Sequence, residues 1–255
     1  YGDPYIATTH IELRARAIEN KIKTHSIHAS SSLTSMIGEC GLHFYKIGRI
    51  ATIMSEMKSL TTPYYVIYKN LIEGNHTVLL LEYNQDKKFF LDPKDALKGL
   101  LETEQGQARK VITESNYVII ASRIGFKDQA IVSGKISSLK ETDFGQPPHT
   151  IIIPGRLHFT ESDALKLFGK CVDEPFDNSE KTEKISNQMI KKYVPMVREA
   201  LEEIEPLYKN QKEFEVILDN AERYIKDAEI FLGEGRDENA ILSIGYADGL
   251  VDALR

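Results

Sequence analysis

Short apolar runs alternate with helical patterns over the first 170 residues, and this alternation constrains the fold more than any other feature. The runs at residues 78–81 and 117–121 are apolar throughout. Unbroken apolar strands are typical of a sheet that is buried on both faces, whereas half-exposed strands alternate apolar and polar side chains. Helical segments between such strands indicate an α/β architecture. We therefore predict that residues 1–170 form α/β structure.

Turn and cap signals divide this part into elements. Thr9 with Glu12, Thr62, Asp92 and Thr160 are expected to cap helices, because their side chains accept backbone N–H groups, and proline follows Thr62 and Asp92 in the first turn. Helices are predicted at residues 10–19, 33–37, 62–74, 93–101, 135–142 and 160–169. Strands are predicted at residues 24–29, 49–54, 76–83, 117–121, 129–132 and 150–153.

The first residues combine turn formers with a carboxylate. Gly2 permits a positive φ, and Pro4 forces Asp3 out of the α conformation, so the Asp3 carboxylate is expected at the mouth of a tight turn. The N-terminus of the following helix would point back at this turn. A ligand-binding loop is one interpretation. An ordinary loop before a helix is the more frequent one for so short a motif.

Other segments also combine polar groups with defined turns. The serine run at residues 30–32 places hydroxyls and backbone N–H groups at a predicted helix start, and residues 122–125 follow a buried strand directly. The Pro-Pro pair at residues 147–148 makes a stiff, extended connection that delivers His149 to a fixed place. Taken alone, a histidine after prolines is more often a strand-end residue than a ligand contact.

Five blocks of sequence together resemble the diphthine synthase family, which belongs to the tetrapyrrole-methylase-like class of S-adenosylmethionine-dependent methyltransferases. The resemblance covers about residues 1–170 in order and spacing. The blocks are GDPYIATTH, Ser32-Leu33 before IGECGLHFYKIG, HTVLLLEY, ASRIG and DFGQPPHTIIIPGRLHF. The resemblance implies two α/β domains with S-adenosylmethionine in the cleft between them. Residues 1–47 would be the remaining half of the first domain and residues 48–170 the second.

The same resemblance implies an activity and a site. The enzyme would methylate the modified histidine side-chain amine of translation elongation factor 2 in diphthamide biosynthesis, as a homodimer. The low cysteine content itself favours a cytoplasmic location. Leu81 and Ile124 would form an apolar slot for adenine, although Ile124 stands where the family more often has a smaller residue. No general base is assigned, because the sulfonium already activates the methyl group. The residues that would line the cofactor site are Asp3, Ile6, Ser32, Leu33, Leu81, Ile124 and His149.

The chain departs from the family at its start, where the family has a further strand and a Gly-rich turn that contacts the cofactor. We therefore expect an upstream segment to be missing, with an exposed sheet edge or apolar face beside Asp3. A chain without that first loop has a competing interpretation. It would be a catalytically incomplete remnant that acts as a protein-interaction module through its C-terminal helices.

Beyond residue 170 the pattern becomes purely helical. Residues 171–178 are expected to be a linker, and Ser179 is expected to cap the first helix of an all-α domain at residues 179–255. Apolar residues spaced three and four apart predict helices at about residues 179–206, 214–232 and 240–254, with Pro195 as a kink and Pro206 as a stop. A three-helix bundle buries such stripes. The segment resembles a small archaeal helical family of uncharacterised function.

Charge and cysteine content argue against several classes of protein. Residues 171–255 contain 20 acidic and 11 basic residues, against 18 and 21 in residues 1–170, so no strongly basic nucleic-acid surface is expected. No apolar run approaches the roughly 20 residues of a membrane span. Cys40 and Cys171 lack paired spacing, which gives no sign of a disulfide framework or a zinc site. We expect neither a metal nor a membrane partner.

Overall fold

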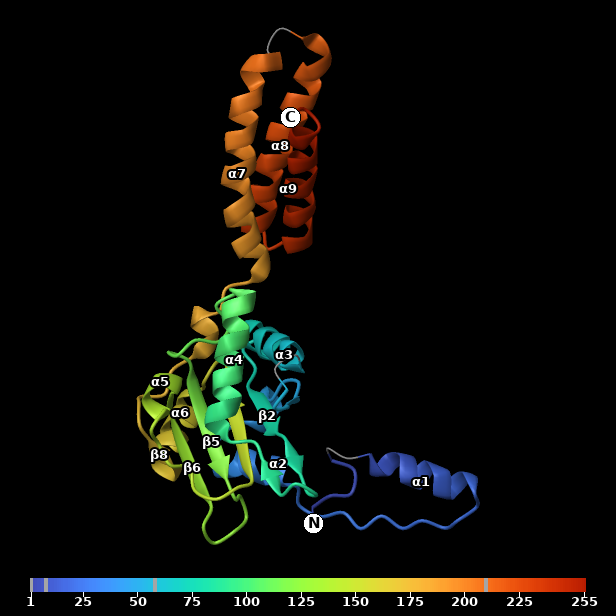
Figure 1. The fold of residues 1–255 in the computed structure, drawn as a ribbon, viewed down its shortest axis with the longest axis vertical. Helices are drawn as coiled ribbons and strands as arrows, with labels where there is room; N and C mark the ends of the chain where they lie inside the picture. Colours follow the sequence, from blue (N-terminus) through green and yellow to red (C-terminus); the bar gives the residue numbers. More distant parts are fainter. Residues whose placement is uncertain (1, 7–8, 57–58, 209–210) are drawn as a thin grey trace. The chain divides into compact units, whose positions relative to one another are not determined.

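The computed structural model describes residues 2–6, 9–56, 59–208 and 211–255 of the chain (Figure 1). It contains two compact units, Tyr1–Thr182 and Glu183–Arg255. Within the described ranges, no helix has the length and apolarity that crossing a bilayer requires. The first unit contains the sheets and carries the candidate site.

A six-stranded mixed sheet forms the centre of the first unit, in the order β1-β2-β7-β5-β6-β8. Strand β7 pairs antiparallel with both β2 and β5. The carboxyl ends of β2 and β5 therefore lie beside the amino end of β7, at the same end of these three strands. A separate hairpin joins β3 (Tyr83–Asn84) to β4 (Phe89–Phe90). The bounds of the main strands are β1 Ala51–Ile53, β2 Thr77–Leu81, β5 Tyr117–Ser122, β6 Ala130–Lys135, β7 His149–Ile153 and β8 Lys170–Cys171.

Helices cover both faces of this sheet. Ile120 of β5 packs on the side of α3 and α4, whereas its neighbour Ile119 packs on the side of α2 and α6. Successive side chains of a strand point to opposite faces, so a strand covered on both sides must be apolar throughout. The predicted α/β class is confirmed. The helices are α1 His10–Glu19, α2 Ser32–Glu39, α3 Thr61–Ile72, α4 Pro93–Gln107, α5 Ile136–Leu139 and α6 Phe159–Phe168.

The structure confirms some of the predicted helix N-caps and contradicts others. Asp92 caps α4 as expected and accepts a 2.8 Å hydrogen bond from the Lys94 amide. Helix α1 begins after Thr9, but the Thr9 side chain makes no cap hydrogen bond. The predicted Thr62 cap is wrong, because the N-cap of α3 is Leu60, two residues earlier. The predicted strand at residues 24–29 is not formed in the structure.

The start of α6 corrects another expectation. Its N-cap is His158, not Thr160, and the His158 ring accepts from the Thr160 amide. In return the Glu161 carboxylate accepts a 2.8 Å hydrogen bond from the His158 amide. This reciprocal arrangement is a capping box. It was not predicted because histidine is an uncommon N-cap residue.

The first unit is continuous across the expected boundary near Gly48. Met36 and Ile37 of α2 are buried against the same sheet that the later strands form, so residues 32–47 are not separated from it. The expected linker at residues 171–178 is also part of this unit. Asn178 is buried, and its side-chain amide donates to the backbone oxygens of Tyr117 and Pro154. The expected Ser179 cap is wrong, because Asp177 caps a 3-10 helix, η3 (Asn178–Lys181), instead.

The second unit is the predicted three-helix bundle, with α7 Ile185–Tyr208, α8 Lys212–Gly233 and α9 Asp237–Asp252. Its core contains small and branched side chains from all three helices, including Val197, Ala228 and Ala247. The prediction that Pro206 ends the first helix is wrong, since α7 continues to Tyr208. Tyr208 donates a 2.9 Å hydrogen bond to the Leu254 carbonyl, which ties the end of α7 to the end of the chain.

Candidate functional site

A pocket of about 540 Å³ opens where β2 and β5 end. Its walls come from the turn at residues 2–6, the serine run before α2, the end of β2 and the turn after β5. Pockets of this size are typical of small-molecule sites, which occur in open α/β folds at the carboxyl ends of strands. Five of the seven expected site residues line it together: Asp3, Ile6, Ser32, Leu33 and Ile124.

Asp3 provides a carboxylate in the wall of this pocket. Its Oδ1 accepts a 3.0 Å hydrogen bond from the Tyr5 amide, and its Oδ2 lies 2.7 Å from Nδ1 of His28. The Tyr5 amide, followed by His28, lowers the pKa of the Asp3 carboxyl below its usual 3.8. Gly2 has φ +89°, which confirms the expected turn. The pocket therefore contains a negative charge near neutral pH.

The N-terminus of α2 forms a second wall, which offers hydrogen-bond donors where Asp3 offers an acceptor. Ser31 is its N-cap and accepts from the Leu33 amide at 3.2 Å. The first turn of a helix has free amide N–H groups and a partial positive charge, which favour an anionic ligand group. The side chains of Ser30, Ser32 and Ser35 add hydroxyls to this wall. The pocket thus combines an anionic side and a hydrogen-bond-donating side.

The turn after β5 forms the third wall with Ile124, Gly125 and Phe126. Arg123 and Gly125 both have positive φ, +51° and +87°. Gln129 fixes the turn by accepting from the Gly125 amide at 3.0 Å and donating to Glu39 of α2 at 2.7 Å. The sequence block ASRIG predicted Ile124 here, but no pattern in the sequence marked Phe126.

Two expected site residues do not line the pocket in the structure. The side chain of Leu81 packs on the face of the sheet that α3 and α4 cover, and its neighbour Leu80 faces the pocket instead. Period-two alternation along a strand accounts for this shift by one residue. His149 begins β7, pairs in register with Ser122 of β5, and its Nε2 lies 3.1 Å from the Gly145 oxygen. His149 is therefore close to the third wall but outside it.

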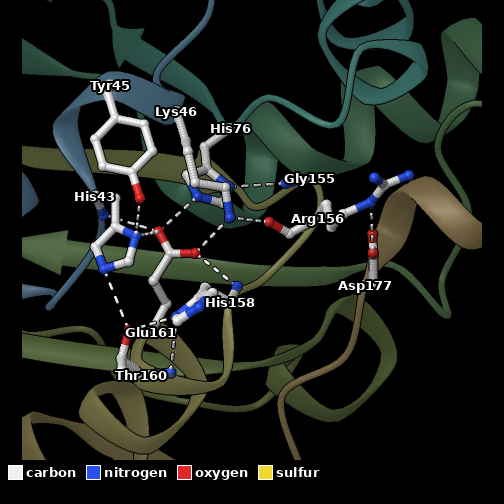
Figure 2. A network of polar contacts seen from close by, with 10 residues as sticks. All are labelled: His43, Tyr45, Lys46, His76, Gly155, Arg156, His158, Thr160, Glu161 and Asp177. Atoms are coloured by element: carbon white, nitrogen blue, oxygen red, sulfur yellow. Dashed lines mark hydrogen bonds and ion pairs between the residues drawn. The ribbon is translucent and has the colours of Figure 1, made fainter.

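A second polar cluster lies at the other end of β2 and centres on buried Glu161 (Figure 2). Glu161 accepts from Nε2 of His76 at 2.9 Å, from Nζ of Lys46 at 2.6 Å and from the His43 amide at 2.8 Å. Nδ1 of His76 accepts from the Gly155 amide, so Nε2 carries the proton that His76 donates to Glu161. This cluster was not predicted, because its members are far apart in sequence.

The charges and hydrogen bonds of this cluster give Glu161 a structural role. Burial alone raises the pKa of Glu161, but hydrogen bonds from His76, the His158 amide and Lys46 outweigh burial and hold the pKa well below its usual 4.5. An ionised carboxylate with four donors has no free capacity for proton transfer. It joins η1 (Phe44–Lys46), the start of β2 and α6.

Comparisons with known proteins decide the family. The model of the tetrapyrrole (corrin/porphyrin) methylases matches residues 1–140. The chain belongs to this family. A second model, that of a protein family of unknown function named DUF357, matches residues 192–255 in the helical bundle.

Several relatives of this tetrapyrrole methylase are diphthine synthases. The protein of Methanocaldococcus jannaschii is 40% identical over 169 residues, and that of Methanococcus maripaludis strain C5 is 40% identical over 167 residues. Each match covers 65% of this chain and 65% of the relative. A crystal structure of diphthine synthase superimposes with a TM-score of 0.59 at 30% identity, covering 67% of this chain and 64% of that one. The expected resemblance is confirmed over this shared part.

Proposed function

We propose that the chain binds S-adenosylmethionine in the pocket beside Asp3 and catalyses methyl transfer. The observation that carries this proposal is the convergence of three chemically different walls at the carboxyl ends of β2 and β5, in a chain of the tetrapyrrole methylase family. Bound S-adenosylmethionine supplies an activated methyl group on a cationic sulfonium. The remaining work of the protein is to bind, to orient and to exclude water.

The residues present fit this ligand by the chemistry of their groups. The Asp3 carboxylate suits amino or hydroxyl donors, and the free N–H groups at the start of α2 suit a carboxylate. Ile6, Leu33 and Ile124 give the apolar contacts that an adenine base requires. Of the two expected residues outside the pocket, Leu81 would act through the position of its strand. His149 would act by framing the turn after β5.

For the methyl acceptor, we take the diphthine synthase relatives as the guide. Because these relatives are named diphthine synthase, the proposed substrate is the modified histidine side-chain amine of translation elongation factor 2, in diphthamide biosynthesis. The acceptor amine uses its lone pair to form a new carbon–nitrogen bond while the carbon–sulfur bond breaks. Alignment of the two reactants is the main contribution of the site, so no residue is assigned as a base. A cytoplasmic homodimer without nucleic-acid or membrane partners completes the proposal.

The helical bundle supports a second candidate function. Residues Glu183–Arg255 form a compact unit with a core of their own, which is the organisation of an independent interaction module. In this alternative the bundle binds a protein partner and the tetrapyrrole-methylase part is inactive. Measurements of ligand binding distinguish the methyltransferase from the interaction module, because an inactive remnant has no reason to retain selectivity for S-adenosylmethionine.

The test is a thermal-shift series with four ligands. S-Adenosylmethionine and S-adenosylhomocysteine should raise the melting temperature, whereas a nicotinamide dinucleotide and ATP should not. A ligand at about 100 times its Kd stabilises the folded state by roughly 2.7 kcal/mol, which a melting curve detects easily. Equal stabilisation by all four ligands, or by none, would argue for the interaction module.

A further inference from the structure

The turn after β5 is fixed at both ends. The Phe126 amide donates back to the Arg123 carbonyl at 2.9 Å, which closes the turn. Gln129 holds its middle by accepting from the Gly125 amide, and links it to α2 through Glu39. These contacts set the position of the Phe126 backbone before any ligand arrives.

Arg123 in turn fixes the ring of Phe126. The guanidinium carbon lies 4.4 Å from the ring centroid, within the range of a cation–π contact. The same guanidinium forms a 2.8 Å ion pair with Asp128 and donates to the Pro147 oxygen at 3.3 Å. One face of the ring is thereby covered, while the residue as a whole remains 55% exposed.

Phe126 also has a distinctive place in the pocket. Among the described residues that line the pocket, it is the one aromatic side chain, and the others offer a carboxylate, hydroxyls and aliphatic groups. The Phe126 side chain is half-exposed and borders the pocket, so its ring is accessible to a bound ligand. Planar bases stack readily on such rings.

Resting on the function proposed above, we propose that Phe126 is a ligand-binding residue of the site and receives the adenine base on the face opposite Arg123. The alternative contact for this ring is the cationic sulfonium. Arg123 already occupies the ring as its cation, and the Asp3 carboxylate in the same pocket is the stronger partner for a second one. A neutral base does not compete for that carboxylate, which favours the adenine end of the ligand.

Isothermal titration of the protein with S-adenosylmethionine, S-adenosylhomocysteine and adenosine tests this assignment. Phe126→Leu keeps an apolar side chain but removes the ring. It should weaken binding of all three ligands by a similar factor of about ten, equivalent to ~1.4 kcal/mol. Phe126→Tyr keeps the ring face and should bind all three within about threefold of the unchanged protein.

Two controls show whether a loss of affinity comes from the Phe126 ring itself. Phe159→Leu makes the same change at an exposed ring outside the pocket, 70% exposed on α6, and should leave all three affinities unchanged. Circular dichroism should show that each variant is folded. Unaltered adenosine binding by Phe126→Leu would overturn the assignment, as would a loss confined to S-adenosylmethionine, which would place the sulfonium on the ring. A loss in Phe126→Tyr as large as that in Phe126→Leu would also overturn it.

Failure of the proposed function has a different signature. If the unchanged protein binds adenosine through Phe126 but not S-adenosylhomocysteine, the base-stacking inference stands and the methyltransferase proposal fails. If it binds neither, both are overturned.

Discussion

His76 donates a 2.9 Å hydrogen bond to Glu161 across 85 positions of sequence, and both side chains are fully buried. This contact joins the amino end of β2 to the first turn of α6 (Figure 2). The candidate site lies at the carboxyl end of the same strand. The Glu161 cluster therefore anchors one end of a strand whose other end forms a wall of the pocket.

We predict that Glu161→Gln lowers the free energy of unfolding by about 3 kcal/mol, because the neutral amide removes the charge that pairs with Lys46 and places an NH2 group among buried hydrogen-bond donors. Urea denaturation followed by circular dichroism measures the change. Glu174→Gln is the matched control. Glu174 pairs with Lys166 at the surface, where its side chain is 83% exposed, so a change of less than about 0.5 kcal/mol is expected. Similar effects in both variants would refute a structural role for the cluster.

The lowered pKa of Glu161 predicts that the stability of the protein depends on pH. The pKa of Glu161 is lowered by folding, so the unfolded chain binds its proton more readily than the folded one. The stabilising contribution is complete above the usual carboxyl pKa of 4.5 and is lost as the pH falls below it. Unfolding free energies at pH 7 and pH 4 should therefore differ more in the unchanged protein than in Glu161→Gln. An identical difference in both proteins would contradict this prediction.

Gly155 gives a steric prediction beside the same cluster. A Cβ at this position would lie 2.3 Å from the Asn75 carbonyl oxygen, and backbone atoms cannot move aside as a flexible side chain would. Gly155→Ala should destabilise the protein by about 1–3 kcal/mol, measured by urea denaturation. Gly106→Ala in α4 has open space around it and should be neutral or stabilising by up to ~1 kcal/mol. Equal effects of the two changes would show that Gly155 is not sterically constrained.

The bundle is expected to fold without the rest of the chain. Its core includes Ala247, which is fully buried, and the contacts of that core lie within residues 183–255. The isolated segment should show a helical circular-dichroism spectrum and a cooperative melt. Ala247→Asp should abolish that melt by burying a charge, whereas Ala253→Asp, at an exposed position after α9, should preserve it. A disordered spectrum for the unchanged segment would refute independent folding.

The sequence predicted the sheet well because burial on both faces leaves a local signal. Apolar runs such as residues 117–121 are recognisable without any knowledge of their partners. The position of a domain boundary leaves no such local signal in the sequence. Asn178 looked like a linker residue, and only its buried hydrogen bonds to Tyr117 and Pro154 show that it belongs to the first unit.

The candidate site was predictable where the backbone turn itself carries the information. Gly2 and Pro4 imply the turn that presents Asp3, and the serine run implies a helix start. The choice between Leu80 and Leu81 depends on which face of β2 meets the pocket, and an apolar strand does not reveal that. Phe126 has no sequence signal at all, because its role depends on Arg123 and on a turn geometry that only the fold defines.

Asp3 places a negative charge in the wall of the pocket. Asp3→Ala should weaken the thermal stabilisation by S-adenosylhomocysteine, because it removes the carboxylate that Tyr5 and His28 hold in the pocket wall. A loss of about tenfold in affinity is expected from one charge-assisted hydrogen bond of ~1.5 kcal/mol. Asp219→Ala, on the exposed surface of α8, is the control and should bind as the unchanged protein does. His149→Ala should cause a smaller loss, since it frames the turn after β5 without lining the pocket. Full stabilisation of the Asp3→Ala protein would show that this pocket is not the cofactor site.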